Sequence, residues 1–138
     1  MVTAASSAEY DPRRWAAPCA RALAQGATLP GLANANSRGT ADAIACRARF
    51  GLSGPGRSLR PGGVAGTLFD ALADARAEAL GALWLPGIAR NLDLRRDAPT
   101  HAKALWRGWA YAVFRQRPAP CPADFHGEVQ ALGRMLDA

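Results

Sequence analysis

The chain has 138 residues, of which 49% are hydrophobic, and its formal net charge is +6 at pH 7. This length and apolar content fit one compact domain with a core of its own. No apolar run approaches the roughly 20 residues of a membrane-spanning helix, and residues 1–15 lack the apolar centre of a secretory signal. We therefore expect a soluble, cytoplasmic protein.

The charge and the cysteines narrow the function classes further. All basic residues except Lys103 are arginine, and alanine, glycine and proline are also abundant, as is typical of a GC-rich genome. Basicity therefore indicates an acidic partner without identifying it. Cys19, Cys46 and Cys121 are far apart and odd in number, so a reducing compartment suits them better than a disulfide framework.

Two helices are predicted at the start of the chain from the spacing of apolar side chains. The first covers about 11–26, and Pro18 inside it predicts either a later start or a kink. The second covers about 40–50, with Ser37 or Thr40 as its cap. The apolar stripe of the second helix is Ala41, Ile44, Ala45 and Ala48.

The clearest helix follows a glycine- and proline-rich loop at 51–66. Thr67 is predicted to cap it, with Asp70 three residues later as in a capping box. Pro86 breaks this helix, and a short helix is expected over 87–93. The predicted apolar stripe of the long helix is Leu68, Leu72, Ala75, Ala79 and Leu83.

Pro99 opens a further helix over about 100–117, and Asp124 is expected to cap a last one. The residues predicted to share the apolar face of the 100–117 helix are Leu105, Trp106, Trp109, Ala112 and Val113. Strand patterns are scarce, so the sequence predicts an all-α fold. We expect an irregular bundle of about five helices in a single domain, 1–138.

Two patterns resemble ligand sites without the context of one. Residues 51–58 match a phosphate-binding loop except that Arg57 replaces lysine. A predicted helix precedes them and Pro55 removes a backbone N–H, so an inter-helix loop is the better interpretation. The candidate metal ligands are Cys121, Asp124, His126 and His101. No second paired motif completes a four-ligand site, so we interpret the histidines as surface residues.

Patterns for catalysis and for nucleic-acid binding are equally weak. Asp70, Asp74 and Glu78 follow i, i+4 spacing, and we expect them on a solvated helix face where they stabilise the helix dipole. Residues 102–117 alternate aromatic and basic side chains, as surfaces that bind single-stranded nucleic acid do. Their tryptophans also follow a helical stripe, which favours core packing.

Two segments resemble a known family. Residues 69–82 (FDALADARAEALGA) with 86–92 (PGIARNL) resemble the signature helix and turn of the T subunit of aerobic cobaltochelatase. Residues 38–43 (RGTADA) resemble the R-G-x-A-D-A segment of the same family. The chain departs from the family at Asp74, where glutamate is usual, and in a shorter connection between the first two helices. We also expect it to lack the acidic linker and the carboxy-terminal von Willebrand A-type domain of the family.

The resemblance implies an accessory module of the ATP-dependent cobaltochelatase, which inserts cobalt into a corrin precursor in aerobic cobalamin biosynthesis. In that family a large subunit inserts the metal and an AAA+ subunit hydrolyses ATP. We therefore expect this chain to bind both subunits, and to have no catalytic residue, metal or cofactor of its own. The candidate partner-binding residues, all expected to be exposed, are Arg76, Glu78, Arg90 and Asn91.

Several alternatives stay open. Arg76 pairs locally and Asn91 caps a turn in the simpler interpretation of these residues. The chain as a whole is alternatively a small basic helical domain that binds nucleic acid through 102–117, which predicts binding that weakens steeply with salt. A third reading is a non-functional remnant of a longer protein.

Overall fold

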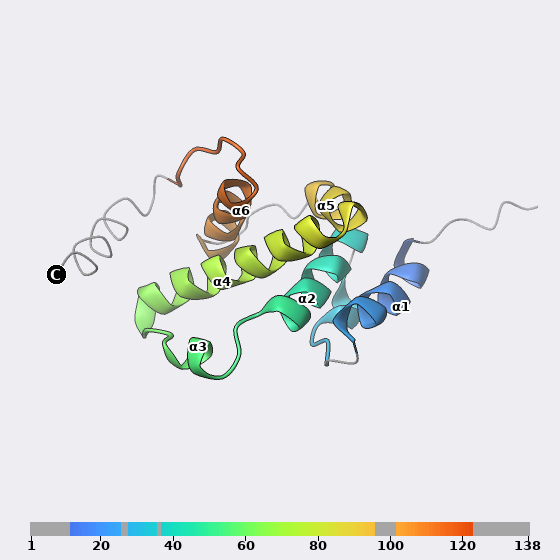
Figure 1. Ribbon diagram of the computed structural model, residues 1–138, viewed down its shortest axis with the longest axis horizontal. Coiled ribbons are helices and arrows are strands. Elements are labelled where there is room, and N and C mark those ends of the chain that lie inside the picture. Colours follow the sequence, from blue (N-terminus) through green and yellow to red (C-terminus); the bar gives the residue numbers. More distant parts are fainter. Residues whose placement is uncertain (1–11, 26–27, 36, 96–101, 123–138) are drawn as a thin grey trace, which may run out of the picture.

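Six α-helices and one 3-10 helix form the part of the chain that the computed structural model describes, which is residues 12–25, 28–35, 37–95 and 102–122. These residues contain no strand, so the predicted all-α class is confirmed. The last predicted helix, from Asp124, lies outside them. The elements in chain order (Figure 1) are α1 (Pro12–Ala24), η1 (Leu32–Asn34), α2 (Arg38–Phe50), α3 (Pro55–Ser58), α4 (Gly63–Trp84), α5 (Pro86–Asp93) and α6 (Ala102–Phe114).

The long helix α4 is the centre of the arrangement (Figure 1). Helix α2 packs against one side of α4 and α6 against another, while α1 lies on α2 and α5 turns back to contact both α2 and α4. Among the described helices, α1, α2, α4, α5 and α6 are the long ones, which confirms an irregular bundle of about five helices. None of the described helices has the length and apolar run that crossing a bilayer requires.

A side-chain cap and two prolines account for three of the helix starts. Ser37 caps α2 as predicted, since its Oγ accepts a hydrogen bond from the Thr40 backbone N–H at 3.1 Å. Pro86 opens α5, and Leu85 before it is extended because proline disfavours a helical neighbour on that side. Helix α1 begins at Pro12 and includes Pro18, so a start after Pro18 is excluded.

The start of α4 differs from the prediction. The helix begins at Gly63, and Thr67 lies exposed inside it instead of capping it. The Asp70 carboxylate, which a capping box would direct at the Thr67 backbone, accepts two hydrogen bonds from the Arg60 guanidinium at 2.9 and 2.8 Å. This pairing lowers the pKa of Asp70. Because α4 extends upstream to Gly63, Thr67 cannot cap it, and Asp70 pairs with Arg60 instead of closing a capping box.

Small residues build the contact between α2 and α4. The fully buried alanines of these two helices include Ala41, Ala45, Ala71, Ala75 and Ala77. Gly81 of α4 lies directly against Cys46 of α2, where a Cβ would collide with the cysteine sulfur. Burial, followed by the nearby Glu78 carboxylate, raises the pKa of the Cys46 thiol to about 12. The two helices therefore approach closely enough to seal this thiol from water.

The predicted apolar faces are confirmed for α2 and only partly for α4 and α6. In α4, Ala75 is buried, but Leu83 at the end of the predicted stripe is 79% exposed. Helix α6 buries Trp106 and Tyr111, whereas Leu105 and Val113 of the predicted face are exposed. Alanine recurs on several sides of both helices, so apolar spacing alone does not decide which side faces the core.

The sealed thiol gives a test of this packing. We expect exposed Cys19 to react readily with iodoacetamide at pH 8 and Cys46 to react only in denaturant. The thiolate is the reactive form, and a pKa of about 12 keeps Cys46 protonated at that pH. Peptide mapping by mass spectrometry reports both sites. Comparable labelling of Cys46 and Cys19 in the native chain would contradict the packing.

Candidate functional site

A fully buried carboxylate lies where three helices meet. Glu78 of α4 accepts hydrogen bonds from Arg95, whose two terminal nitrogens lie 3.3 and 3.2 Å from the two carboxylate oxygens. Arg47 of α2 donates a further hydrogen bond at 3.1 Å. Arg107 of α6 places its Nε 3.8 Å from Glu78 Oε1. The Glu78 cluster, which consists of these four residues, thus connects α2, α4, α6 and the residue that follows α5.

Burial makes this cluster energetically demanding. Moving a carboxylate out of water costs several kcal/mol, which the protein recovers only through close and well-directed cations. Three guanidinium groups surround one carboxylate, and less than a third of each arginine side chain is exposed to solvent. Desolvation lowers the pKa of Arg107 even though Glu78 opposes the change. The cluster therefore connects these helices through specific ion pairs, and it carries more positive than negative charge.

A second polar network joins α2 to α5. Asp42 is almost completely buried and accepts a hydrogen bond from Asn91 Nδ2 at 2.7 Å on one oxygen. Its other oxygen accepts a hydrogen bond from Arg38 Nε at 2.9 Å. Gly39, one turn before Asp42, lies so close to α5 that a Cβ would clash with the Asn91 carbonyl oxygen. The segments 38–43 and 69–92 are therefore in direct contact through Asn91.

The structure separates the four predicted partner-binding residues into two pairs. Arg76 and Arg90 are exposed as expected, and Arg76 donates a 3.3 Å hydrogen bond to the Phe50 carbonyl oxygen. The prediction that Glu78 is exposed is wrong, because α2 and α6 cover its side of α4 and their arginines neutralise it. Asn91 is half-buried and is engaged by Asp42, which corrects its predicted exposure too.

The carboxylates Asp70, Asp74 and Glu78 were expected on one solvated face, and they have three different environments. Asp70 pairs with Arg60, Asp74 lies 3.3 Å from Lys103 Nζ, and Glu78 is buried in its cluster. The prediction of a solvated face is therefore wrong for Glu78. Sequence spacing missed this cluster because its arginines come from positions 17 to 31 residues away.

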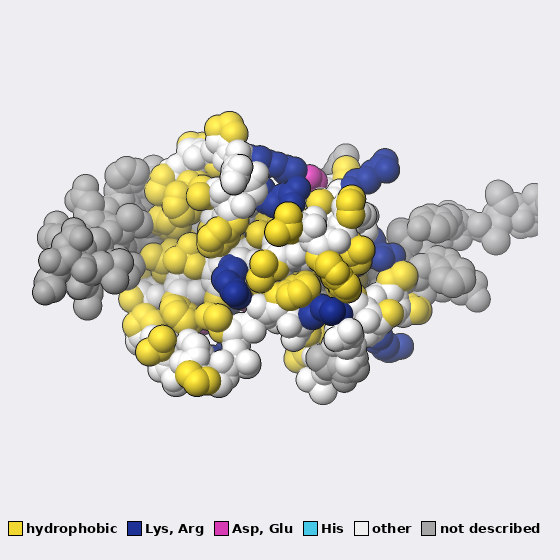
Figure 2. All heavy atoms as spheres, in the orientation of Figure 1, with side chains coloured by type: hydrophobic (Ala, Val, Ile, Leu, Met, Phe, Trp, Pro, Cys, Tyr) yellow, Lys and Arg dark blue, Asp and Glu magenta, His cyan; other side chains and the backbone are white. Residues whose placement is uncertain are grey.

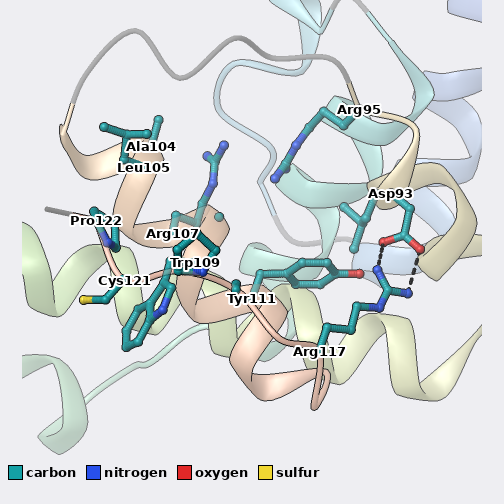
Figure 3. A pocket seen from close by; sticks show the side chains of 14 residues that line it. Asp93, Arg95, Ala104, Leu105, Arg107, Trp109, Tyr111, Arg117, Cys121 and Pro122 are labelled. Carbon is teal, nitrogen blue, oxygen red and sulfur yellow. Dashed lines mark hydrogen bonds and ion pairs between the residues drawn. The ribbon is translucent and has the colours of Figure 1, made fainter.

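A cavity of about 700 Å³ adjoins the Glu78 cluster between the end of α5, α6 and residues 117–122. Figure 3 shows Arg95 and Arg107 on its walls and the Tyr111 hydroxyl directed toward the Asp93–Arg117 pair. Arg117 donates two hydrogen bonds to Asp93 at 2.8 and 2.9 Å, and these lower the pKa of that carboxyl. The sequence held no signal for this cavity, because its lining comes from three separate segments.

Of the two ligand-like patterns, the one that resembles a phosphate-binding loop lies fully within the described residues and keeps its simpler interpretation. Residues 51–58 follow helix α2, and their second half is the single helical turn α3, so the strand that precedes a phosphate-binding loop is replaced by a helix. The described residues contain no group of three metal-ligating side chains. Asp124, His126 and His101 lie outside them.

The buried charge predicts a large stability loss on neutralisation. Glu78→Gln leaves three guanidinium groups without their shared anion, and we expect it to lower the free energy of unfolding by about 3 kcal/mol or more. Asp70→Asn is the matched control, because its ion pair with Arg60 is solvent-exposed and screened. Chemical denaturation measures both. A loss for Asp70→Asn as large as that for Glu78→Gln would refute the special role of the cluster.

The contact at Gly39 predicts opposite effects for two glycine-to-alanine changes in helices. Gly39→Ala should destabilise the chain by about 1–3 kcal/mol, because the methyl group meets the Asn91 backbone. Gly108→Ala should stabilise it by up to about 1 kcal/mol, since nothing lies near a Cβ there and alanine favours the helix. Thermal unfolding compares the two. A neutral Gly39→Ala variant would show that α2 and α5 are farther apart.

Comparison with known proteins gives a family match over most of the chain. The chain matches the family described as "Cobalamin biosynthesis protein CobT" over residues 14–110, which include both segments joined at Asn91. Neither a curated protein nor a solved structure gives a significant match. Because the match covers well over half of the 138 residues, the chain belongs to the CobT family of cobalamin biosynthesis proteins.

Proposed function

We propose that this chain is a cytoplasmic, non-catalytic module of an ATP-dependent cobaltochelatase, the enzyme that inserts cobalt into a corrin precursor. Membership of the CobT family carries the proposal, since that family belongs to cobalamin biosynthesis. In the proposed role the chain binds the AAA+ subunit and, through the assembly, the large chelatase subunit. ATP, magnesium and cobalt are then handled by those partners.

The ion pairs of the carboxylates favour a structural role for these residues over a catalytic one. All carboxylates in the described residues take part in ion pairs with arginine or lysine; they are Asp42, Asp70, Asp74, Glu78 and Asp93. A general acid or base must reach the proton that it transfers, and each of these carboxylates already contacts a cation of the same chain. These groups therefore fit a structural role better than proton transfer.

The nucleic-acid alternative loses its main support. Trp106 is buried and packs edge-to-face against Trp109 with ring centroids 5.3 Å apart, as the predicted core packing requires. Lys103, Arg107 and Arg117 each lie beside a carboxylate of this chain. Trp106 is thus directed inward, and Lys103, Arg107 and Arg117 are already paired, which leaves fewer side chains on this segment to stack on bases and contact phosphates.

A binding experiment with the AAA+ cobaltochelatase subunit tests the proposal. We expect the immobilised chain to retain that subunit, with or without nucleotide, and an unrelated AAA+ protein to pass through. The reconstituted chelatase should also lose cobalt insertion when the chain is omitted. Absence of binding under both nucleotide conditions, at low as well as physiological salt, would exclude the proposed role.

A further inference from the structure

An apolar groove runs between the second half of α4 and the end of α6. Its volume is about 520 Å³, and its walls include Leu80 and Leu83 of α4 and Phe114 of α6. Leu83 is 79% exposed and Phe114 is 49% exposed. Figure 2 shows hydrophobic side chains along α4 on this face of the molecule, with separate basic side chains among them and very little acidic surface. We call this surface the α4–α6 groove.

The groove carries positive charge that no carboxylate of its lining balances. Arg76 and Arg115 are part of its walls, and the other lining residues are uncharged. Arg76 is exposed and donates one hydrogen bond, at 3.3 Å, to the Phe50 backbone carbonyl oxygen. The Nε of Arg115 is buried and has no hydrogen-bond partner.

The shape and spacing of the groove fit a helix. Arg76, Leu80 and Leu83 occupy positions i, i+4 and i+7 of α4 and therefore form a ridge along one side of that helix. The end of α6 supplies the opposite wall through Phe114 and Arg115. A third helix packs naturally into a channel between two others, and amphipathic partner helices bind by placing apolar anchors at this same spacing.

We propose that the α4–α6 groove receives an amphipathic helix of the AAA+ subunit. The apolar residues of that helix cover Leu80, Leu83 and Phe114, and aspartate or glutamate residues beside its apolar stripe pair with Arg76 and Arg115. The choice of partner rests on the proposed function. We infer acidic residues on the partner helix from Arg76 and Arg115, because opposite charges at the rim of an interface steer association and fix the register of the two surfaces.

The test compares substitutions inside and outside the groove by calorimetric titration of the AAA+ subunit. Leu83→Glu should weaken binding roughly tenfold or more, since a charge replaces an apolar anchor. Leu59→Glu is the matched control, because Leu59 is 76% exposed and does not line the groove. Arg76→Gln with Arg115→Gln should reduce both the affinity and its salt dependence, whereas Arg57→Gln should change neither. Circular dichroism confirms that each variant is folded.

The possible results of this titration distinguish the groove, the proposed function and the acidic character of the partner helix. Loss of binding for Leu83→Glu with full retention for Leu59→Glu supports the groove. Equal binding by Leu83→Glu and the unchanged chain overturns the groove and leaves the proposed function intact. Failure of the unchanged chain to bind overturns the proposed function, and the assignment of this occupant falls with it. A loss of affinity without any change in salt dependence for the double arginine variant would exclude acidic groups on the partner helix.

Discussion

The ion pairs of Glu78 are the constraint on which the rest of the structure depends. A buried carboxylate is tolerated only while its cations are in place, and here they come from α2, α6 and the residue after α5. The helices around it meet largely through alanine and glycine, which bury little apolar area and hold few distinctive shapes. We infer that the directed contacts at Glu78 fix how the helices are aligned against one another, because alanine and glycine surfaces alone would allow several alignments.

The two segments that resemble the cobaltochelatase T subunit act on each other in this fold. Gly39 permits the close approach of α2 to the Asn91 backbone, and Asp42 then binds the Asn91 side chain. Gly39, Asp42 and Asn91 therefore hold α2 and α5 together. The surface proposed for partner binding lies elsewhere, on the side of α4 that carries Arg76 and Leu83. Those two positions are seven residues apart, about two helical turns, whereas Glu78 lies on the opposite side.

The high arginine content has a structural explanation in addition to any genomic one. Many of the described arginines make specific contacts within the fold: Arg38, Arg47, Arg49, Arg60, Arg95, Arg107 and Arg117. Arg49 also lies over the rings of Phe50 and Trp84. The net charge of +6 therefore does not measure the basic surface available to a partner. That surface is better represented by arginines such as Arg76 and Arg90, which are exposed and form no ion pair with a carboxylate of the described residues.

Local features of the sequence determined the all-α class, the cap at Ser37, the break at Pro86 and the family, because caps, prolines and motif residues act over one or two helical turns. Only the tertiary structure decided which side of α4 is buried. Alanines on several sides of that helix made its apolar period ambiguous, so Leu83 was expected inside and Glu78 outside. The reverse holds because α2 and α6 bring three arginines to Glu78, and a contact between residues tens of positions apart leaves no local signal.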